Sequence, residues 1–275
     1  MKKGWVSYPY IFWMILFTLV PLLLVLYYSL TAPDPSGNSV LTADNFRRFI
    51  EPIYIKVLAR SIVLALTSTL ICLLVGYPVA MILSGRDLSR RNLLVLLFVI
   101  PMWMNFLLRT YAWMTLLDRK GVLNSLLGMV GLPRLNILYT DAAVILGMVY
   151  NFLPFMVLPI FSVLSKIDRS VVEAAEDLGS DSFTVFRRII FPLSFPGVVS
   201  GITMVFMPAV TTFIISKLLG GSQYMLIGNL IEDQFTRVYD WNFGSAVSIV
   251  MMLLILVSMG IMSRYDKEDM GGGLL

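Results

Sequence analysis

The chain has 275 residues, of which 58% are hydrophobic and 14% are charged, and its formal net charge is +4. A mean hydropathy of +0.83 excludes a water-soluble domain of this length, so the sequence is that of an integral membrane protein. Histidine is absent and Cys72 is the only cysteine, which excludes an internal disulfide, histidine-based metal ligation and a histidine general base. We therefore expect neither a metal site nor catalytic residues in this chain.

The apolar residues are distributed as in an all-α, polytopic membrane protein. A helix that crosses the hydrocarbon core needs about 20 consecutive apolar residues, and six windows of the chain meet this requirement. The strict alternation of apolar and polar residues that marks a transmembrane barrel does not occur. We predict one transmembrane domain over residues 1–275, whose first span is retained because it is too long for a signal peptide. The six windows are roughly 8–30, 61–83, 93–117, 142–165, 197–218 and 243–262.

Basic residues in short segments indicate the orientation. Such segments weigh most in the positive-inside rule, and here they precede the first span and join the second span to the third. This predicts that both termini and residues 166–196 lie in the cytoplasm. The positive net charge then suits contact with anionic lipid headgroups and requires no nucleic-acid partner. The residues concerned are Lys2, Lys3, Arg86, Arg90 and Arg91.

Two longer segments, 31–60 and 118–141, fall on the outer side under this orientation. Their glycines and prolines are typical of turns, and residues 44–56 are compatible with a short interfacial helix. Four acids on this side suit an outer mouth that collects cations or meets a binding protein, and they suit a solvated loop equally well. They are Asp118, Glu232, Asp233 and Asp240.

The most informative polar stretch is residues 166–196, between the fourth and fifth spans. Ser170 followed by Glu173 has the form of a capping box, which predicts a helix from about Val171. Gly179 is well placed just beyond the C-terminus of this helix, where a positive φ costs glycine nothing. A second short helix is predicted to follow and to end before Pro192, because proline interrupts a helix interior. An ordinary loop with two helical turns is the competing interpretation.

The spacing within this stretch resembles the signature loop of ABC-importer permeases. Glu173-Ala174-Ala175 is followed after three residues by Gly179, and later by Ile189, Phe191 and Pro192. The chain departs from the family pattern at Phe191, where leucine is usual. In that family the loop couples the permease to a separate ATPase, and we call residues 166–196 the coupling segment. The resemblance implies coupling roles for Glu173, Ala174, Ala175, Asp177, Gly179, Phe183, Phe186, Arg187 and Pro192.

The resemblance also implies a type I, MetI-like permease fold and a set of partners. These are a second homologous permease subunit, two copies of an ATPase that binds ATP and Mg²⁺, and an extracytoplasmic binding protein, assembled at the prokaryotic inner membrane. The residues agree that ATP is bound elsewhere, because no G-x-x-x-x-G-K-[ST] phosphate-binding motif occurs in the chain. We expect no cofactor on this chain.

Further motifs are similar to the polyamine branch of these permeases, which imports spermidine and putrescine. They are Leu153-Pro154-Phe155-Met156, Leu226-Ile227-Gly228-Asn229 and Asp240-Trp241-Asn242-Phe243-Gly244. The resemblance implies a polyamine substrate and an extracytoplasmic polyamine-binding protein. Another small cationic solute or an amino-acid-like solute is the alternative within the importer class.

A path for a polycation must stabilise ammonium groups away from bulk water, through carboxylates, amide oxygens or aromatic faces. The cores of the spans hold no acid, so we expect amide and cation–π contacts, although lipid-facing packing is the competing role for each aromatic residue. Lys217 would repel a polycation if it faced the path. Pro208 marks a helix break that could form a gate. The candidates are Trp103, Asn105, Tyr111, Tyr150, Asn151, Phe206, Pro208, Thr211, Thr212 and Phe213.

Two other classes of function are disfavoured. A secondary transporter would need coupling groups, but intramembrane acids and histidines are lacking and no inverted repeat is evident. A membrane-embedded enzyme would need a cluster of histidine, aspartate or cysteine residues within the bilayer, which the sequence does not contain.

Overall fold

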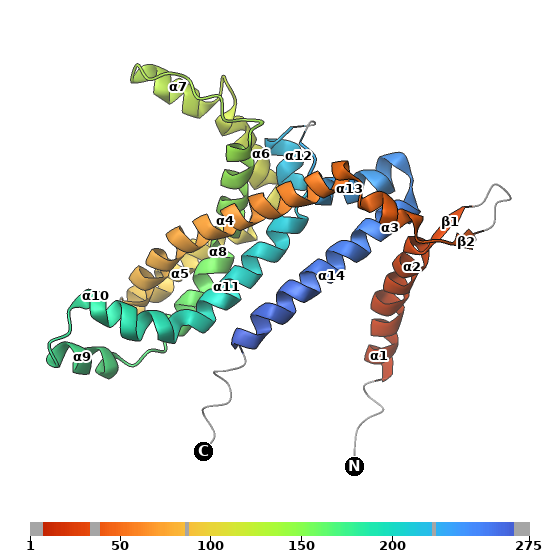
Figure 1. The fold of residues 1–275 in the computed structure, drawn as a ribbon. Helices are drawn as coiled ribbons and strands as arrows, with labels where there is room; N and C mark the ends of the chain where they lie inside the picture. The colour runs from red at the N-terminus through yellow and green to blue at the C-terminus, as the bar shows by residue number, and fades with distance from the viewer. Residues whose placement is uncertain (1–7, 34–38, 86–87, 222–223, 267–275) are drawn as a thin grey trace, which may run out of the picture. The chain divides into compact units, whose positions relative to one another are not determined.

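The computed structural model describes residues 8–33, 39–85, 88–221 and 224–266. Within these ranges, five helices are long and apolar enough to cross a membrane, and a sixth span exists if one bent helix pair is counted as a single crossing. The predicted all-α, polytopic fold is therefore confirmed (Figure 1). Of the residues that predict the orientation, Lys2, Lys3 and Arg86 and the side chains of Arg90 and Arg91 lie outside what the structure describes.

The chain divides into two compact units. Unit 1 consists of residues 1–59 and 227–257, and unit 2 consists of residues 60–226 and 258–275. Two long helices, α4 and α14, each contribute residues to both units. The residues predicted for the coupling segment and for the solute path all belong to unit 2.

Unit 1 begins with one apolar span, Tyr8–Ser29, whose side chains are largely exposed within the isolated chain. Asn242 and Asn45 hold the end of this span, since the Asn242 Nδ2 donates to the Thr31 carbonyl (2.7 Å) and the Asn45 Nδ2 donates to the Ser29 carbonyl (3.1 Å). The elements are α1 (Tyr8–Met14), a π-helical turn (Ile15–Leu19), α2 (Val20–Ser29), the antiparallel strands β1 (Thr31–Pro33) and β2 (Ser39–Leu41), α3 (Asp44–Phe49), the start of α4 (Pro52–Ser84), α13 (Ile227–Asp233), a π-helical turn (Gln234–Val238) and most of α14 (Trp241–Asp266).

Unit 2 is built around the packing of α8 against α11. A Cβ atom at Gly201 would lie 2.8 Å from the Sδ of Met156 and 3.1 Å from its carbonyl oxygen, so the two backbones approach at a position that only glycine permits. After the shared helix α4, the elements are α5 (Leu88–Trp103), α6 (Phe106–Leu117), α7 (Val122–Met129), α8 (Asp141–Leu164), α9 (Arg169–Asp177), α10 (Ser182–Val185), a π-helical turn (Phe186–Ile190), α11 (Phe191–Thr211) and α12 (Ile214–Leu219).

Two of the six predicted windows differ in form from the helices observed. The window 93–117 holds two helices that meet at 89°, because the chain leaves the helical conformation at Asn105 (φ −55°, ψ 128°). The fifth crossing is a continuous helix over Ser182–Thr211. The expectation that the second coupling helix ends before Pro192 is therefore wrong. Pro192 lies in the first turn of α11, where its fixed φ suits a helix, and the π-helical turn before it absorbs the change in hydrogen bonding.

Candidate functional site

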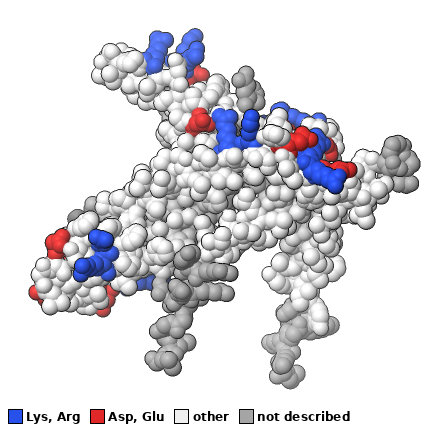
Figure 2. Space-filling model, in the orientation of Figure 1, with Lys and Arg blue, Asp and Glu red and all other residues white. Residues whose placement is uncertain are grey.

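The coupling segment lies at the end of unit 2 where α8 finishes, opposite the end that carries α12 (Figure 1). Figure 2 shows charged side chains on this segment and at the opposite end of the unit, with an uncharged surface between them. None of the nine residues of α9 is buried. The structure thus places an exposed polar helix at one end of a membrane-spanning bundle.

The first coupling helix, α9, begins at Arg169, two residues earlier than the sequence predicts. The Asp168 carboxylate accepts a hydrogen bond from the Ser170 amide (3.0 Å), and Asp168 is the N-cap residue. The predicted Ser170–Glu173 capping box is therefore wrong: the acid two residues upstream of Ser170 takes the cap position. This amide hydrogen bond lowers the pKa of the Asp168 carboxyl, because it stabilises the ionised form.

Gly179 ends α9 in a Schellman motif. Its φ is +83°, its amide donates to the Glu176 carbonyl (2.8 Å), and the Ser180 amide donates to the Ala175 carbonyl (3.1 Å). The predicted position of Gly179 beyond the helix C-terminus is confirmed. No atom lies within 4 Å of the position that a Cβ would occupy, so the glycine is required by its backbone conformation and not by crowding within this chain.

The second half of the segment is fixed to the bundle by aromatic packing. The Thr184 hydroxyl donates to the Asp181 carboxylate (2.6 Å) at the start of α10, and this contact lowers the pKa of the Asp181 carboxyl. The Phe186 ring meets the edge of Tyr77 in α4 with a centroid distance of 5.8 Å. Tyr77 also contacts Phe191 (6.0 Å). Phe186 is thus an anchor to the bundle, and Phe191, the departure from the family pattern, completes the same cluster.

Most of the other coupling residues are exposed in the isolated chain. Leu178 and Phe183 are 88% and 68% exposed, although both are large and apolar. Leu178 was not among the predicted residues, but an apolar side chain directly before the helix-ending glycine of a short polar helix is a signal that could have found it. The remaining exposed coupling residues are Glu173, Ala174, Asp177, Arg187 and Pro192, and Ala175 is half-buried.

The path candidates on α5 and α6 lie on or near the surface of unit 2. Trp103 is exposed at the end of α5, and Tyr111 is exposed on α6. Asn105 is the N-cap of α6, because its Oδ1 accepts hydrogen bonds from the amides of the next turn at 2.8 and 3.4 Å. Trp113 brings α6 to α8 through an edge-on contact with Tyr150, at a centroid distance of 5.2 Å.

The candidates on α8 and α11 include buried polar groups and a helix break. Asn151 is 2% exposed and its Nδ2 donates to the Gly147 carbonyl (2.8 Å), whereas its Oδ1 has no hydrogen-bond partner in the described part of the chain. Phe206 is buried and Pro208 is half-buried within α11. The break itself comes at Thr212, which is extended (ψ 136°). Around it, Thr211 donates to the carbonyl four residues earlier, and Phe213 is exposed.

The four acids predicted at the outer mouth do not form one cluster of free carboxylates. Asp240 pairs with Arg48 at 2.7 Å and caps α14 by accepting from the amide three residues later (3.0 Å). Asp233 pairs with the arginine four residues later at 3.4 Å. Glu232 is half-buried in the same unit. Asp118 belongs to unit 2, where it is exposed and accepts from the amide two residues later (2.9 Å).

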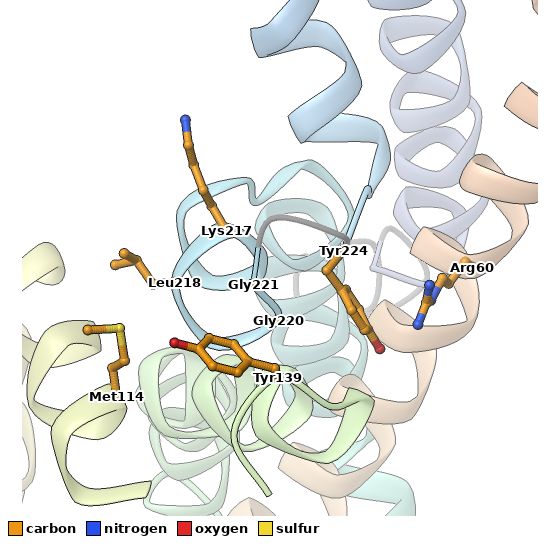
Figure 3. A pocket seen from close by; sticks show the side chains of 8 residues that line it. All are labelled: Arg60, Met114, Tyr139, Lys217, Leu218, Gly220, Gly221 and Tyr224. Carbon is orange, nitrogen blue, oxygen red and sulfur yellow. The ribbon is translucent and has the colours of Figure 1, made fainter. Parts of the chain in front are cut away.

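A pocket of about 690 Å³ opens at the end of unit 2 opposite the coupling segment (Figure 3). Sequence reasoning did not find it, because its lining comes from four separate parts of the chain. The lining residues are Arg60, Met114, Tyr139, Lys217, Leu218, Gly220, Gly221 and Tyr224.

Comparison with known proteins identifies the family. Residues 73–268 match the model of the family described as "Binding-protein-dependent transport system inner membrane component". The chain is 41% identical over 254 residues to the spermidine/putrescine transport system permease protein PotB of Escherichia coli strain K12, which covers 89% of this chain and 92% of that protein. It is 40% identical to the Haemophilus influenzae protein of the same name, over 93% and 91% of the two chains.

Solved structures agree at the level of the fold. A chain of a bacterial ABC transporter that imports the acidic polysaccharide alginate superposes with a TM-score of 0.80 at 17% identity, over 97% of this chain and 98% of that one. A chain of the methionine ABC transporter MetNI superposes with a TM-score of 0.56 at 17% identity, over 79% and 98%. The chain is therefore a multi-pass inner-membrane permease of the binding-protein-dependent ABC transporter family, whose members work with a separate ATPase and a periplasmic binding protein.

Proposed function

We propose that this chain is one of two permease subunits of an importer that moves spermidine and putrescine into the cell. The observation that carries the proposal is the 41% identity to a spermidine/putrescine permease over 89% of the chain, which is far more than the coupling segment alone. The complete importer would contain a second homologous permease, two copies of the ATPase with its ATP and Mg²⁺, and an extracytoplasmic polyamine-binding protein.

In this proposal the ATPase docks on the exposed side of the coupling segment, which faces the cytoplasm together with both termini. Leu178 and Phe183 supply the apolar contact, since apolar side chains of this size exposed outside the bilayer favour a partner surface. Glu173 and Gly179 lie on the same exposed segment. The Phe186 anchor to Tyr77 lets a displacement of the segment act on the bundle as a rigid-body movement.

The solute path would use amide oxygens and aromatic faces in unit 2. The buried Oδ1 of Asn151 is a hydrogen-bond acceptor that an ammonium group of the solute would satisfy, and leaving such an atom unpaired is costly. Tyr150 on α8 and Trp113 on α6 offer aromatic faces for cation–π contacts elsewhere in the unit. At the outer mouth, Asp118 is the acid best suited to collect cations, because Asp233 and Asp240 already pair with arginines.

An importer of an amino-acid-like solute is the second candidate. The observation in its favour is Arg109, a buried residue of α6 whose Nε has no hydrogen-bond partner among the described residues. A guanidinium group suits a solute carboxylate and opposes a polycation.

Uptake of labelled spermidine tests the proposal and separates the two candidates. We expect that cells without this chain and without a second polyamine system lose uptake, that the intact gene restores it, and that putrescine competes while amino acids do not. Glu173→Ala and Gly179→Asp should leave the protein in the membrane and abolish uptake. Competition by an amino acid alone would instead support the second candidate, and normal uptake by both variants would contradict the docking role of the segment.

A further inference from the structure

The pocket at the end of unit 2 opposite the coupling segment has features of a recognition site. Arg60 lies over the ring of Tyr224 at 3.8 Å from its centroid, and the Arg60 Nη2 donates to the Asp141 carboxylate at 3.0 Å. The stack and the ion pair hold the guanidinium in place, yet its side chain remains 43% exposed. An arginine fixed in this way keeps further N–H donors for a ligand, because a guanidinium carries five.

Tyr224 provides a second donor. The residue is 8% exposed, and its hydroxyl is buried without a hydrogen-bond partner in the part of the chain that the structure describes. Burying such a hydroxyl unpaired is costly. Figure 3 shows the Tyr224 ring beside the Arg60 guanidinium, whereas Lys217 extends from α12 on another side of the pocket. The Tyr224 hydroxyl, which has no partner among the described residues, thus belongs to a ring that lies against the Arg60 guanidinium, and this cation can attract an anionic acceptor.

The backbone around the pocket is shaped to hold two aromatic rings. Tyr139 has a φ of +68° and its amide donates to the Leu219 carbonyl at 2.8 Å. A Cβ at Gly221 would lie 2.9 Å from the Tyr139 ring, and a Cβ at Gly220 would lie 2.6 Å from the Tyr224 ring. The two glycines therefore permit both rings to pack directly against the loop after α12.

The charge of the lining decides the class of ligand. Arg60 and Lys217 are cationic and the eight lining residues include no acid, so the group stays net positive even with the Asp141 carboxylate that pairs with Arg60, and this favours a carboxylate ligand over a polyamine. A carboxylate can pair with Arg60 and accept from the Tyr224 hydroxyl at the same time. The segment 117–140, which supplies Tyr139 to the pocket, carries three exposed bases and one exposed acid, Asp118, so it is also net basic. Those bases are Arg119, Lys120 and Arg134.

We infer that this pocket receives a carboxylate side chain of the extracytoplasmic binding protein when that protein docks. The inference rests on the proposed function, which places this end of unit 2 on the outer side, where the binding protein of this family must deliver its solute. A net basic pocket that shares Tyr139 with a net basic, exposed segment is complementary to an acidic protein surface, and it gives docking a fixed register that does not compete with the cationic solute. The partner of the Tyr224 hydroxyl is the docked carboxylate.

Binding of the polyamine-loaded binding protein to the complete transporter in lipid nanodiscs tests this inference. Tyr224→Phe removes only a hydroxyl that has no partner among the described residues, so it should not lower thermal stability, and Tyr27→Phe, in unit 1, is the matched control. We expect Tyr224→Phe and Arg60→Gln each to weaken binding about tenfold, equivalent to about 1.4 kcal/mol, and Tyr27→Phe to bind like the wild type. Higher ionic strength should reduce the loss caused by Arg60→Gln.

Several outcomes would overturn the inference. Wild-type affinity in either pocket variant would do so, and so would a loss of binding in Tyr27→Phe equal to that in Tyr224→Phe. The same assay in phosphatidylcholine alone and with added phosphatidylglycerol addresses a lipid phosphate: if anionic lipid abolishes the difference between Tyr224→Phe and the wild type, the pocket holds a lipid. If the wild type binds the loaded protein and the pocket variants bind it with the same affinity, only this inference is contradicted. If the wild type does not bind the loaded protein, the proposed function is contradicted.

Discussion

Substitutions at Gly179 separate the conformational role of this residue from its place on a docking surface. At φ +83°, an ordinary L-residue is disfavoured by about 1–2 kcal/mol, whereas asparagine tolerates this conformation better than alanine. That cost is small against a typical folding free energy of about 5–15 kcal/mol, so Gly179→Ala and Gly179→Asn should both reach the membrane. Because no atom lies within 4 Å of the Cβ position, neither side chain clashes within the chain.

The two variants should rank in opposite orders for the two roles. If backbone strain in the Schellman turn controls coupling, Gly179→Ala transports less than Gly179→Asn, because alanine pays more of the conformational cost. If the open space beside Gly179 is filled by the ATPase, the larger asparagine side chain transports less. The proposed docking surface predicts the second order, with co-purified ATPase falling in parallel with uptake.

The assays are ATPase co-purification and labelled-spermidine uptake, each normalised to the amount of permease in the membrane. Gly128→Ala is a suitable control, because that glycine also has open space around its Cβ position but lies in α7, outside the coupling segment. Lower uptake in Gly179→Ala than in Gly179→Asn would refute the docking argument and leave only the turn geometry. Equal and normal uptake in both would refute any coupling role for this position.

Three further predictions follow from packing and charge. Gly201→Ala should lower the stability of the purified protein by about 1–3 kcal/mol, seen as a lower midpoint of thermal unfolding in detergent, since the added methyl would lie 3.1 Å from the Met156 carbonyl oxygen. Arg48→Gln should cost about 1 kcal/mol or less, because the ion pair with Asp240 is partly solvated, and Asp240→Asn should cost less still because asparagine can keep the cap. The pKa of the Asp168 carboxyl is lowered in the folded state, so this cap stabilises α9 fully above the ordinary pKa of about 3.9 and the stabilisation is lost as the pH falls through the lowered value. The protection of the α9 amides against hydrogen exchange, measured relative to the intrinsic exchange rate at each pH, should therefore fall on acidification.

Each of these has an outcome that would contradict it. An unchanged midpoint in Gly201→Ala would mean that α8 and α11 can separate without loss. A larger effect of Asp240→Asn than of Arg48→Gln would mean that the carboxylate charge, and not the guanidinium and its stack on Phe243, holds this corner of unit 1. Acid-induced exchange that persists in Asp168→Asn would assign the effect to another group.

Sequence reasoning reached the features that depend on local chemistry. The apolar windows predicted the polytopic fold, and the position of Gly179 beyond a short helix was predicted because a left-handed C-terminus has a local signature. The capping box failed because Asp168 and Ser170 both have cap-forming side chains, and local sequence alone does not rank two such neighbours. Pro192 was misjudged because the same residue type that ends a helix interior also begins a helix.

The features that sequence reasoning missed depend on contacts between distant segments. Arg48 neutralises Asp240 from 192 positions away, so the acids of the predicted outer mouth could not be known to be paired. The pocket joins Arg60 to Tyr139 and Tyr224, which share no sequence pattern. The window expected to be a single span bends at Asn105, which caps the second of its two helices. Sequence reasoning took Asn105 for a path residue, because composition alone does not distinguish a helix cap from a polar residue that faces a solute.

A single continuous helix over Ser182–Thr211 joins the second part of the coupling segment to the fifth crossing. Its 30 residues, at about 1.5 Å each, form a rod about 45 Å long. Its first turn is α10, and the helix ends before the extended residue Thr212. If the segment couples the ATPase to transport as proposed, a tilt of about 5° imposed at α10 would displace Thr211 by about 4 Å, and the break at Thr212 would let α12 stay in place. The π-helical turn Phe186–Ile190 and the prolines inside α11 are the positions at which bending of the helix would reduce that displacement.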